Sequence, residues 1–292
     1  MRLGAGGLAH RALKYINMIE ILGNAMTDAA MQNSPDFLHK IMRPASRAVT
    51  PILILVAWQI ASGSGLIPER TLASPLHVLG TFWSLIADGE LQDNLLVSLR
   101  RAMEGLAIGV SLGTIFALIS GLSRSGEAAV DAPLQILRAI PFLALVPLFI
   151  LWFGIGETPK IALVALGTIY PVYLNLYAGI RGIDKKLLEA GACFGLNRWQ
   201  ILRHIVLPGA LPSFLVGLRY AVGISWLSLV VAEQINASSG IGYLIMSARD
   251  FMRTDIIVVG LVVYGLLGLL TDIFIRTLEH RALAWRPSIL KG

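Results

Sequence analysis

Charged side chains are scarce in this chain. Asp, Glu, Lys and Arg together make up 14% of its 292 residues, whereas hydrophobic residues make up 55%. A soluble domain carries about 25% charged residues, because its surface must be hydrated however large its core is. With a mean hydropathy of +0.71, the composition excludes an ordinary soluble domain and predicts an integral membrane protein.

Disulfides, metal motifs and nucleotide-binding motifs are also lacking. The single cysteine, Cys193, excludes an intramolecular disulfide bond. Neither a G-x-x-x-x-G-K-S/T loop for ATP nor an H-E-x-x-H metal motif occurs, so we expect a protein that is not an enzyme. We also expect no cofactor and no metal site, because the five histidines are scattered without ligand-like spacing: His10, His39, His77, His204 and His280.

Long apolar runs are plentiful. A bilayer requires about 20 mostly apolar residues per helix, and six runs approach this length. They lie near residues 48–66, 102–122, 133–154, 160–180, 209–232 and 256–276. The 29 glycines suit such a bundle, since small residues let membrane helices approach closely. Pro141 and Pro147 fall in the third run and predict a kinked or broken helix there.

The net charge of +6 comes from 24 basic and 18 acidic residues. These basic residues do not indicate nucleic acid, because they lie beside the apolar runs, where they set membrane topology. They gather in residues 1–47, 181–207 and 276–291, whereas segment 67–94 holds Arg70 alone among its basic residues and four acidic ones. This asymmetry predicts that both termini and the 181–207 insert are cytoplasmic and that 67–94 is outside.

The expected domain organisation has three parts. Residues 1–45 form an N-terminal cytoplasmic extension, 46–286 a transmembrane domain, and 287–292 a C-terminal tail. The extension lacks the pattern of a signal peptide. A short amphipathic surface helix is one interpretation of it; a poorly ordered tail, or a start codon assigned upstream of Met42, is the alternative that we favour.

The insert between the fourth and fifth runs has the punctuation of two short helices. Asp184 is a good N-cap, and Gly195 is placed to end the first helix in the left-handed conformation. Asn197 follows as a second N-cap, with Gln200 at capping-box spacing. Pro208 then separates the second helix from the fifth run. The pattern predicts a helix, a glycine turn and a second helix at the cytoplasmic membrane edge.

Both helices of the insert have an apolar side. The first carries Leu187, Leu188 and Cys193 or Phe194, and the second carries Trp199, Leu202, Ile205 and Val206. We expect Cys193 to be a small packing residue. An ordinary amphipathic connector that stabilises the bundle is one interpretation, and a docking element for a water-soluble partner is the other.

The motif in this insert resembles the EAA loop of ATP-binding cassette (ABC) importer permeases. That loop reads Glu-Ala-Ala, three residues, Gly, nine residues, Ile, one residue, Leu-Pro. Six residues match it in register: Glu189, Ala190, Gly195, Ile205, Leu207 and Pro208. Gly191 departs from it by standing where the family has Ala, and glycine keeps the close packing at a cost in helix propensity of up to about 1 kcal/mol.

The resemblance covers roughly residues 45–286 and implies a six-helix type I ABC importer permease fold in a bacterial inner membrane. In that family the loop, here 181–208, forms coupling helices that seat in the ATP-hydrolysing subunit. Glu189 would then contact that subunit, Gly195 would make the turn, and Ile205, Leu207 and Pro208 would fix the angle into the fifth span. The implied partners are two ATP-binding subunits, a solute-binding protein, a second permease copy and the lipid bilayer.

Segments 137–156, 231–243 and 278–287 are similar to the branch that takes up aliphatic sulfonates, taurine and nitrate, and most like the aliphatic sulfonate permeases. Taurine and nitrate remain alternatives. An ion-coupled secondary transporter is the alternative of another class. It would have internal repeats or an acidic residue central in a span, and the sequence has neither.

Polar residues near the spans are the candidates for the transport pathway, because charge at membrane depth is costly. We favour a structural, snorkelling role for Arg138. Arg219 either pairs with Asp272 or faces the pathway. Glu233, before the small and polar run 236–242, is either part of an outer gate or a solvated helix end. Asn175, Ser225 and Ser228 are weaker pathway candidates, since hydroxyls in membrane helices often bond their own backbone.

Overall fold

The computed structural model describes residues 36–235 and 237–285, and every regular element in this part of the chain is helical. The described residues divide into two units at the boundary between residues 60 and 61. The helices are α2 Asp36–Gly63, α3 Pro75–Ala87, α4 Glu90–Leu122, α5 Arg124–Ala139, α6 Phe142–Phe153, α7 Glu157–Arg181, α8 Lys185–Cys193, α9 Arg198–Ile201, a π-helical turn Leu202–Val206, α10 Leu207–Gln234, α11 Ile241–Asp250 and α12 Thr254–Ala282.

The described part of the first unit lies in α2. The apolar portion of α2 is Val49–Gly63, which extends past the end of the first unit. It matches the run expected near 48–66 but is shorter than the about 20 residues that a bilayer requires. The whole helix has 28 residues, and a first span here remains a prediction. The expected extension lies mostly outside the described residues, but α2 begins at Asp36, before the boundary expected at residue 45.

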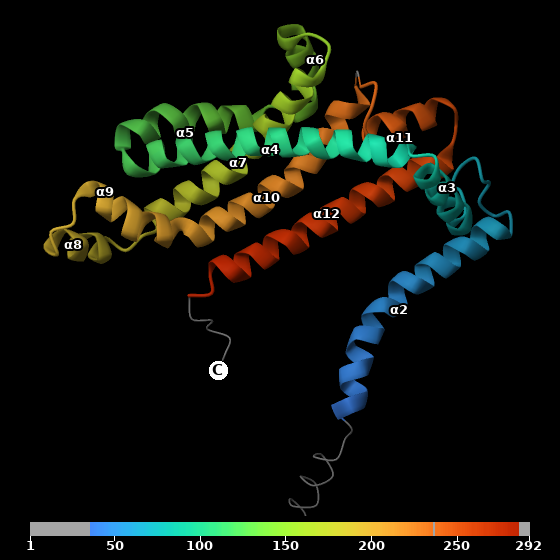
Figure 1. Cartoon of the computed structure of the whole chain (residues 1–292), viewed down its shortest axis with the longest axis horizontal. Helices are drawn as coiled ribbons and strands as arrows, with labels where there is room; N and C mark the ends of the chain where they lie inside the picture. The colour runs from blue at the N-terminus through green and yellow to red at the C-terminus, as the bar shows by residue number, and fades with distance from the viewer. Residues whose placement is uncertain (1–35, 236, 286–292) are drawn as a thin grey trace, which may run out of the picture. The chain divides into compact units, whose positions relative to one another are not determined.

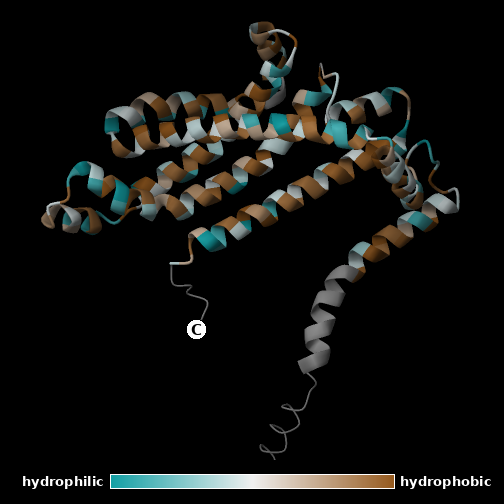
Figure 2. Ribbon diagram, viewed as in Figure 1, coloured by the Kyte–Doolittle hydropathy of each residue, from teal (hydrophilic) through white to brown (hydrophobic). Residues whose placement is uncertain are grey.

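The second unit is built on α4, α7, α10 and α12. α7 packs against both α4 and α10, α10 also contacts α12, and α5 lies along α4. Figure 1 shows α8 and α9 at one end of these helices and α3 and α11 at the opposite end. The long helices are hydrophobic along most of their length, whereas hydrophilic residues gather around α8 and α9 (Figure 2). The expectation of an all-α membrane fold is confirmed.

Within the described residues, four helical stretches are long and apolar enough to cross a membrane. They are Glu90–Leu122, Glu157–Arg181, Arg198–Gln234 and Thr254–Ala282. They contain the runs expected near 102–122, 160–180, 209–232 and 256–276, and each extends beyond the expected boundaries. Large aliphatic side chains on α12 are exposed, for example Leu261 at 58% and Leu270 at 61%. Such a surface suits lipid rather than water.

The expected third span is broken, as its prolines predicted. Segments Arg124–Ala139 and Ala144–Phe153 meet at an angle of 114°. The break begins at Ile140, whose ψ of 126° is extended, because a residue before proline is disfavoured in the helical conformation. Pro147 lies inside α6 without ending it. The proline that breaks the chain is therefore Pro141, and the pair counts as at most one further span.

α4 and α7 approach each other through a row of glycines. Gly105, Gly109 and Gly113 are buried, one helical turn apart, on the face of α4 that meets α7. A Cβ on Gly113 would lie 2.7 Å from the carbonyl oxygen of Ile169, and one on Gly109 would lie 2.5 Å from that of Ala165. The backbones are therefore too close for any side chain, which is the use of small residues that the composition suggested.

Two short helices were missing from the sequence-based expectation. α3 lies within segment 67–94 and α11 within the connection after the fifth run. They share one apolar core with α12, formed around Val78, Leu85, Ile241, Leu244 and Val259. Each has too few residues for the span criterion, so hydropathy with a window of about 20 residues passes over them.

Candidate functional site

The first helix of the insert forms as the sequence predicts. The side chain of Asp184 accepts a hydrogen bond from the backbone N–H of Lys186 at 2.9 Å and caps α8. Gly195 follows the helix with φ of +77°, a left-handed conformation that side chains rarely adopt. The predicted cap and glycine turn are confirmed.

The second helix also begins as predicted. The Asn197 side chain accepts from the backbone N–H of Gln200, and the Gln200 side chain accepts from the backbone N–H of Asn197, both at 2.9 Å. This reciprocal pair is a capping box. It fixes the direction in which the chain leaves the Gly195 turn.

The predicted separation at Pro208 is wrong. Helix continues from Arg198 to Gln234, a stretch of 37 residues. A proline lacks an N–H and its ring clashes with the carbonyl four residues before it. Here the chain widens into the π-helical turn Leu202–Val206, in which the N–H of Leu207 bonds to the carbonyl of Leu202, five residues back. We attribute the tolerance of Pro208 to this wider turn, which leaves α9 continuous with α10.

The surface of the insert combines exposed large apolar side chains with an exposed acidic side chain. Leu187, Phe194 and Trp199 are 56%, 86% and 66% exposed. Glu189 is also exposed, and its carboxylate has no ion-pair or hydrogen-bond partner within the described part of the chain. Cys193 is exposed, so its expected role in packing is wrong. This combination of free apolar and acidic groups can receive another protein.

The residues of the motif divide between this surface and the joint behind it. Ala190 and Leu207 are exposed, whereas Ile205 and Pro208 are partly buried. Gly191 is buried, and a Cβ there would lie 2.7 Å from Cδ1 of Ile205. The departure from the family pattern therefore falls where α8 packs on the second helix. An alanine fits if the end of the Ile205 side chain moves.

A buried ionic cluster lies at the opposite end of the bundle from the insert. Arg101 of α4 and Glu233 of α10 are 2% and 1% exposed, with 2.8 Å between Nη1 and Oε1. Arg101 also donates to both carboxylate oxygens of Glu157, at the start of α7, and to the carbonyl and hydroxyl oxygens of Ser239. Every N–H of the guanidinium group thus has an acceptor.

Glu233 is as well satisfied as Arg101. Its carboxylate accepts from the hydroxyl of Ser98 at 2.8 Å, from the hydroxyl of Tyr264 at 3.1 Å and from the backbone N–H of Gly242 at 2.9 Å. The alternative that Glu233 is a solvated helix end is therefore wrong. A role in a gate remains a prediction.

The cluster also caps the start of α11. The backbone N–H of Gly240 donates to Asn94 and that of Ile241 to Ser98, at 2.7 and 2.8 Å, and Glu233 accepts from the next N–H. The first N–H groups of a helix have no acceptor within that helix. Here side chains of α4 and α10 provide the acceptors. Arg101 was not among the residues predicted from the sequence, because nothing local distinguishes it from its neighbour Arg100, whose side chain is 80% exposed.

The other pathway candidates bond within the bundle. Arg219 donates to Asp272 at 2.7 Å, and Arg276 shares the same carboxylate; the expected pair is present. Asn175 donates to the carbonyl of Pro171 and Ser225 to that of Val222, each in its own helix. Pathway roles for Arg219, Asn175 and Ser225 therefore remain predictions. Among the described residues no group of three or more His, Cys, Asp or Glu side chains is placed to hold a metal ion.

Comparison with known families decides the class. Residues 109–283 match the family described as "Binding-protein-dependent transport system inner membrane component". The chain belongs to this family. The match covers more than half of the chain and includes the whole insert with its motif.

Several relatives of this permease are named for the substrates that they transport. It is 51% identical over 238 residues to the putative aliphatic sulfonates transport permease protein SsuC of Escherichia coli K12, covering 82% of this chain and 90% of the relative. It is 43% identical over 238 residues to the protein of the same name from Bacillus subtilis 168, covering 82% and 86%. The taurine transport system permease protein TauC of Escherichia coli K12 is 34% identical over 257 residues, covering 84% and 93%.

A solved structure shares the fold. The crystal structure of an amino acid ABC transporter with histidines superposes with a TM-score of 0.57 at 18% identity, covering 68% of this chain and 98% of that one. The expected ABC importer permease fold is confirmed. The permease is thus a multi-pass inner-membrane transport subunit rather than an enzyme, and it works with an ATP-hydrolysing subunit and a substrate-binding protein.

Proposed function

We propose that this permease forms the pathway of an importer for aliphatic sulfonates. The proposed substrate rests on sequence identity: the chain is 51% and 43% identical to two putative aliphatic sulfonate permeases and 34% identical to a taurine permease. Two permease copies would enclose one pathway, with two ATP-binding subunits below and a solute-binding protein above. Family membership disfavours an ion-coupled secondary transporter.

The insert is the proposed docking site for the ATP-binding subunit. Its exposed Leu187, Phe194 and Trp199 would fill apolar contacts, and Glu189, which has no partner in the described part of this chain, would meet a polar or basic group. From the distribution of basic residues we infer that this end, and both termini, face the cytoplasm. The ionic cluster of Arg101 and Glu233 then lies toward the outer face.

The continuity of the helix supports a mechanism for transmitting force. Because residues 198–234 form one helical stretch, a displacement of α9 would be carried along α10 to Glu233 at its far end. There the same motion would act on α4, α7 and α11 through the cluster. Closure of the ATP-binding subunits would in this way switch the pathway by rigid-body movement. A gate at the outer end is consistent with this position of Glu233.

The proposed substrate is tested by measuring ATP turnover of the complete importer in nanodiscs. We expect a binding protein loaded with ethanesulfonate to raise ATP turnover severalfold over the unloaded binding protein, because a loaded binding protein promotes the closed state of the ATP-binding subunits. Taurine- and nitrate-loaded proteins serve as comparisons. Stimulation by taurine or nitrate alone would reassign the permease to that substrate, and stimulation by none of the three would refute the branch.

A further inference from the structure

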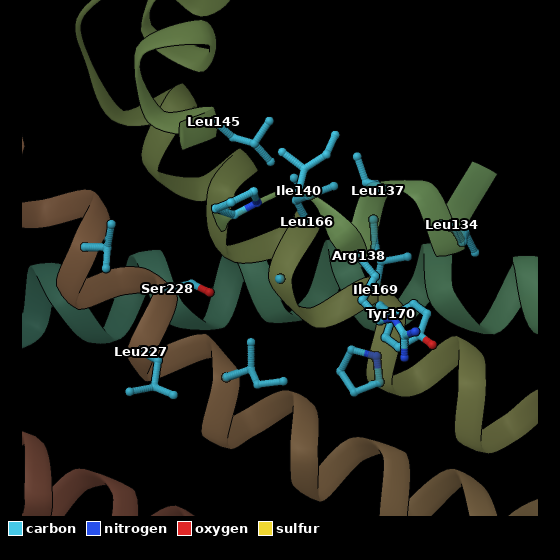
Figure 3. Close-up of a pocket in the computed structure, with 15 residues that line it drawn as sticks. Leu134, Leu137, Arg138, Ile140, Leu145, Leu166, Ile169, Tyr170, Leu227 and Ser228 are labelled. Carbon is cyan, nitrogen blue, oxygen red and sulfur yellow. The ribbon is translucent and has the colours of Figure 1, made fainter. Parts of the chain in front are cut away.

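A cavity of about 470 Å³ lies between α5, α6, α7 and α10 (Figure 3). This volume is in the range of small-molecule sites. Gly167 and Tyr170 line it near the midpoint of the 25-residue helix α7, so the cavity is far from both ends of the bundle. Most of its lining is aliphatic and includes Leu137, Leu166 and Leu227. The cavity is therefore mostly apolar and lies at mid-depth of the membrane domain, and it is open on one side, since its lining residues Ile140 and Leu227 are 39% and 69% exposed.

One cationic side chain reaches this cavity. Arg138 of α5 is exposed and lines the cavity, with the guanidinium carbon 5.1 Å from the centroid of the Tyr170 ring. No carboxylate in the described part of the chain forms an ion pair or hydrogen bond with Arg138, and no Asp or Glu lines the cavity. A charge at membrane depth is costly and normally faces a partner or a pathway. Extension of the Arg138 side chain toward the membrane surface would not by itself provide its guanidinium group with an anionic partner.

A hydroxyl group is also left without a partner. Ser228 of α10 is 3% exposed and lines the cavity, yet it makes no hydrogen bond within the described residues. Its neighbour Ser225 bonds the carbonyl of Val222, as serines in membrane helices commonly do. The hydroxyl of Ser228 is thus available to a molecule in the cavity.

We propose that this cavity is a binding site for the transported molecule, an alkyl sulfonate, inside the permease itself. The sulfonate group is a permanent anion whose oxygens accept from the Arg138 guanidinium and the Ser228 hydroxyl. The alkyl chain lies against the aliphatic lining. This assignment rests on the proposed sulfonate function and goes beyond it by giving the permease a selectivity of its own.

The lining also discriminates among small anions. Sulfate and nitrate have no apolar part to bury. Taurine carries an ammonium group, which would lose its hydration in a cavity whose lining offers no carboxylate. A phospholipid would need its headgroup at mid-membrane depth, away from the interface where headgroups lie. An alkyl sulfonate matches both the one cation and the aliphatic walls.

The direct test measures binding to the permease–ATPase complex in nanodiscs without the binding protein. The probes are ethane-, butane- and hexanesulfonate, with taurine and sulfate as comparisons. We expect affinity to rise by up to about fourfold for each added methylene, with sulfate and taurine much weaker. Equal binding of all probes, or no binding, would overturn the assignment.

Two variants locate the site. Arg138→Gln is expected to weaken butanesulfonate binding about tenfold or more, because it removes a charge-assisted hydrogen bond, and Ser228→Ala severalfold. Arg124→Gln is the matched control, since Arg124 is exposed on the same helix and has no partner within the described residues. Equal affinities for Arg138→Gln and Arg124→Gln would exclude this cavity. If Arg138→Gln does not assemble, Ser228→Ala and the chain-length series decide.

Failure of this site is distinguishable from failure of the sulfonate function. The wild-type importer could be stimulated by sulfonate-loaded binding protein while its permease–ATPase complex shows no chain-length dependence of binding. That result would support the sulfonate function and refute the proposed site. Absence of stimulation removes the function. A phospholipid that copurifies with wild type and is lost from Arg138→Gln, as seen by mass spectrometry, would show a lipid as the occupant and would also overturn the site.

Discussion

Replacing Gly109 with alanine is expected to destabilise the permease severely. The new Cβ would lie 2.5 Å from the carbonyl oxygen of Ala165 and closer still to the hydroxyl of Thr168. A backbone atom cannot turn aside as a flexible side chain does, so α4 and α7 must separate. Overpacking a core costs about 1–3 kcal/mol or more, which exceeds the gain in helix propensity of about 1 kcal/mol from glycine to alanine.

The measurement is the fraction of permease that remains monodisperse after heating, followed by fluorescence-detected size exclusion. Gly265→Ala is the matched control, because Gly265 lies in α12 and a Cβ there meets nothing within 4 Å. We expect the control to be as stable as wild type or slightly more stable. Equal stability of Gly109→Ala and Gly265→Ala would mean that α4 and α7 do not pack through their backbones.

Replacing Arg101 with methionine is expected to be equally damaging, for an electrostatic reason. The substitution leaves Glu233 buried at 1% exposure without its cation. Breaking a buried ion pair from one side costs about 3–5 kcal/mol, a large share of the stability of an ordinary domain. The loss acts on α4, α7, α10 and α11 together, because all four meet at this cluster.

The thermal stability of single and double variants distinguishes the effect of an unpaired buried charge from the effect of lost packing. Arg101→Met with Glu233→Gln is expected to be more stable than Arg101→Met alone, since the neutral amide removes the unpaired buried charge. Arg100→Met is the control: its side chain is 80% exposed and, among the described residues, its ion pair is with Glu104 on the same helix, so we expect little change. A double variant less stable than Arg101→Met would contradict the assigned role of Glu233.

Features that depend on local chemistry were predictable from the sequence. Five of the six expected runs correspond to helical stretches that meet the membrane-spanning criterion, one of them as a bent pair. Pro141 and Pro147 predicted a kinked or broken third run, and the break lies at Pro141, because a proline restricts the residue before it. Asp184, Gly195, Asn197 and Gln200 gave the two helices of the insert, because capping involves only residues close in sequence.

Features that depend on distant contacts were not predictable. Arg101 and Arg100 are adjacent in sequence, yet one is buried among three helices and the other is exposed. Pro208 signals a helix end by local rules, but the π-helical turn before it accommodates the ring. Cys193 lies at apolar spacing and is nevertheless exposed, because no other element in the described part of this chain covers that side of α8.

The central claim is that the insert couples this permease to its ATP-binding subunit. The most direct measurement is copurification of that subunit with Glu189→Lys, together with ethanesulfonate uptake into proteoliposomes. Asp250→Lys is the control for copurification, because Asp250 is an exposed acid at the end of α11, away from the insert.

Charge reversal at Glu189 leaves the fold intact, since its carboxylate has no partner among the described residues. We therefore predict a normally folded permease that loses most of the bound ATP-binding subunit and most of the uptake, while Asp250→Lys retains the subunit. Full retention of the subunit and unimpaired uptake in Glu189→Lys would contradict the docking role of the insert.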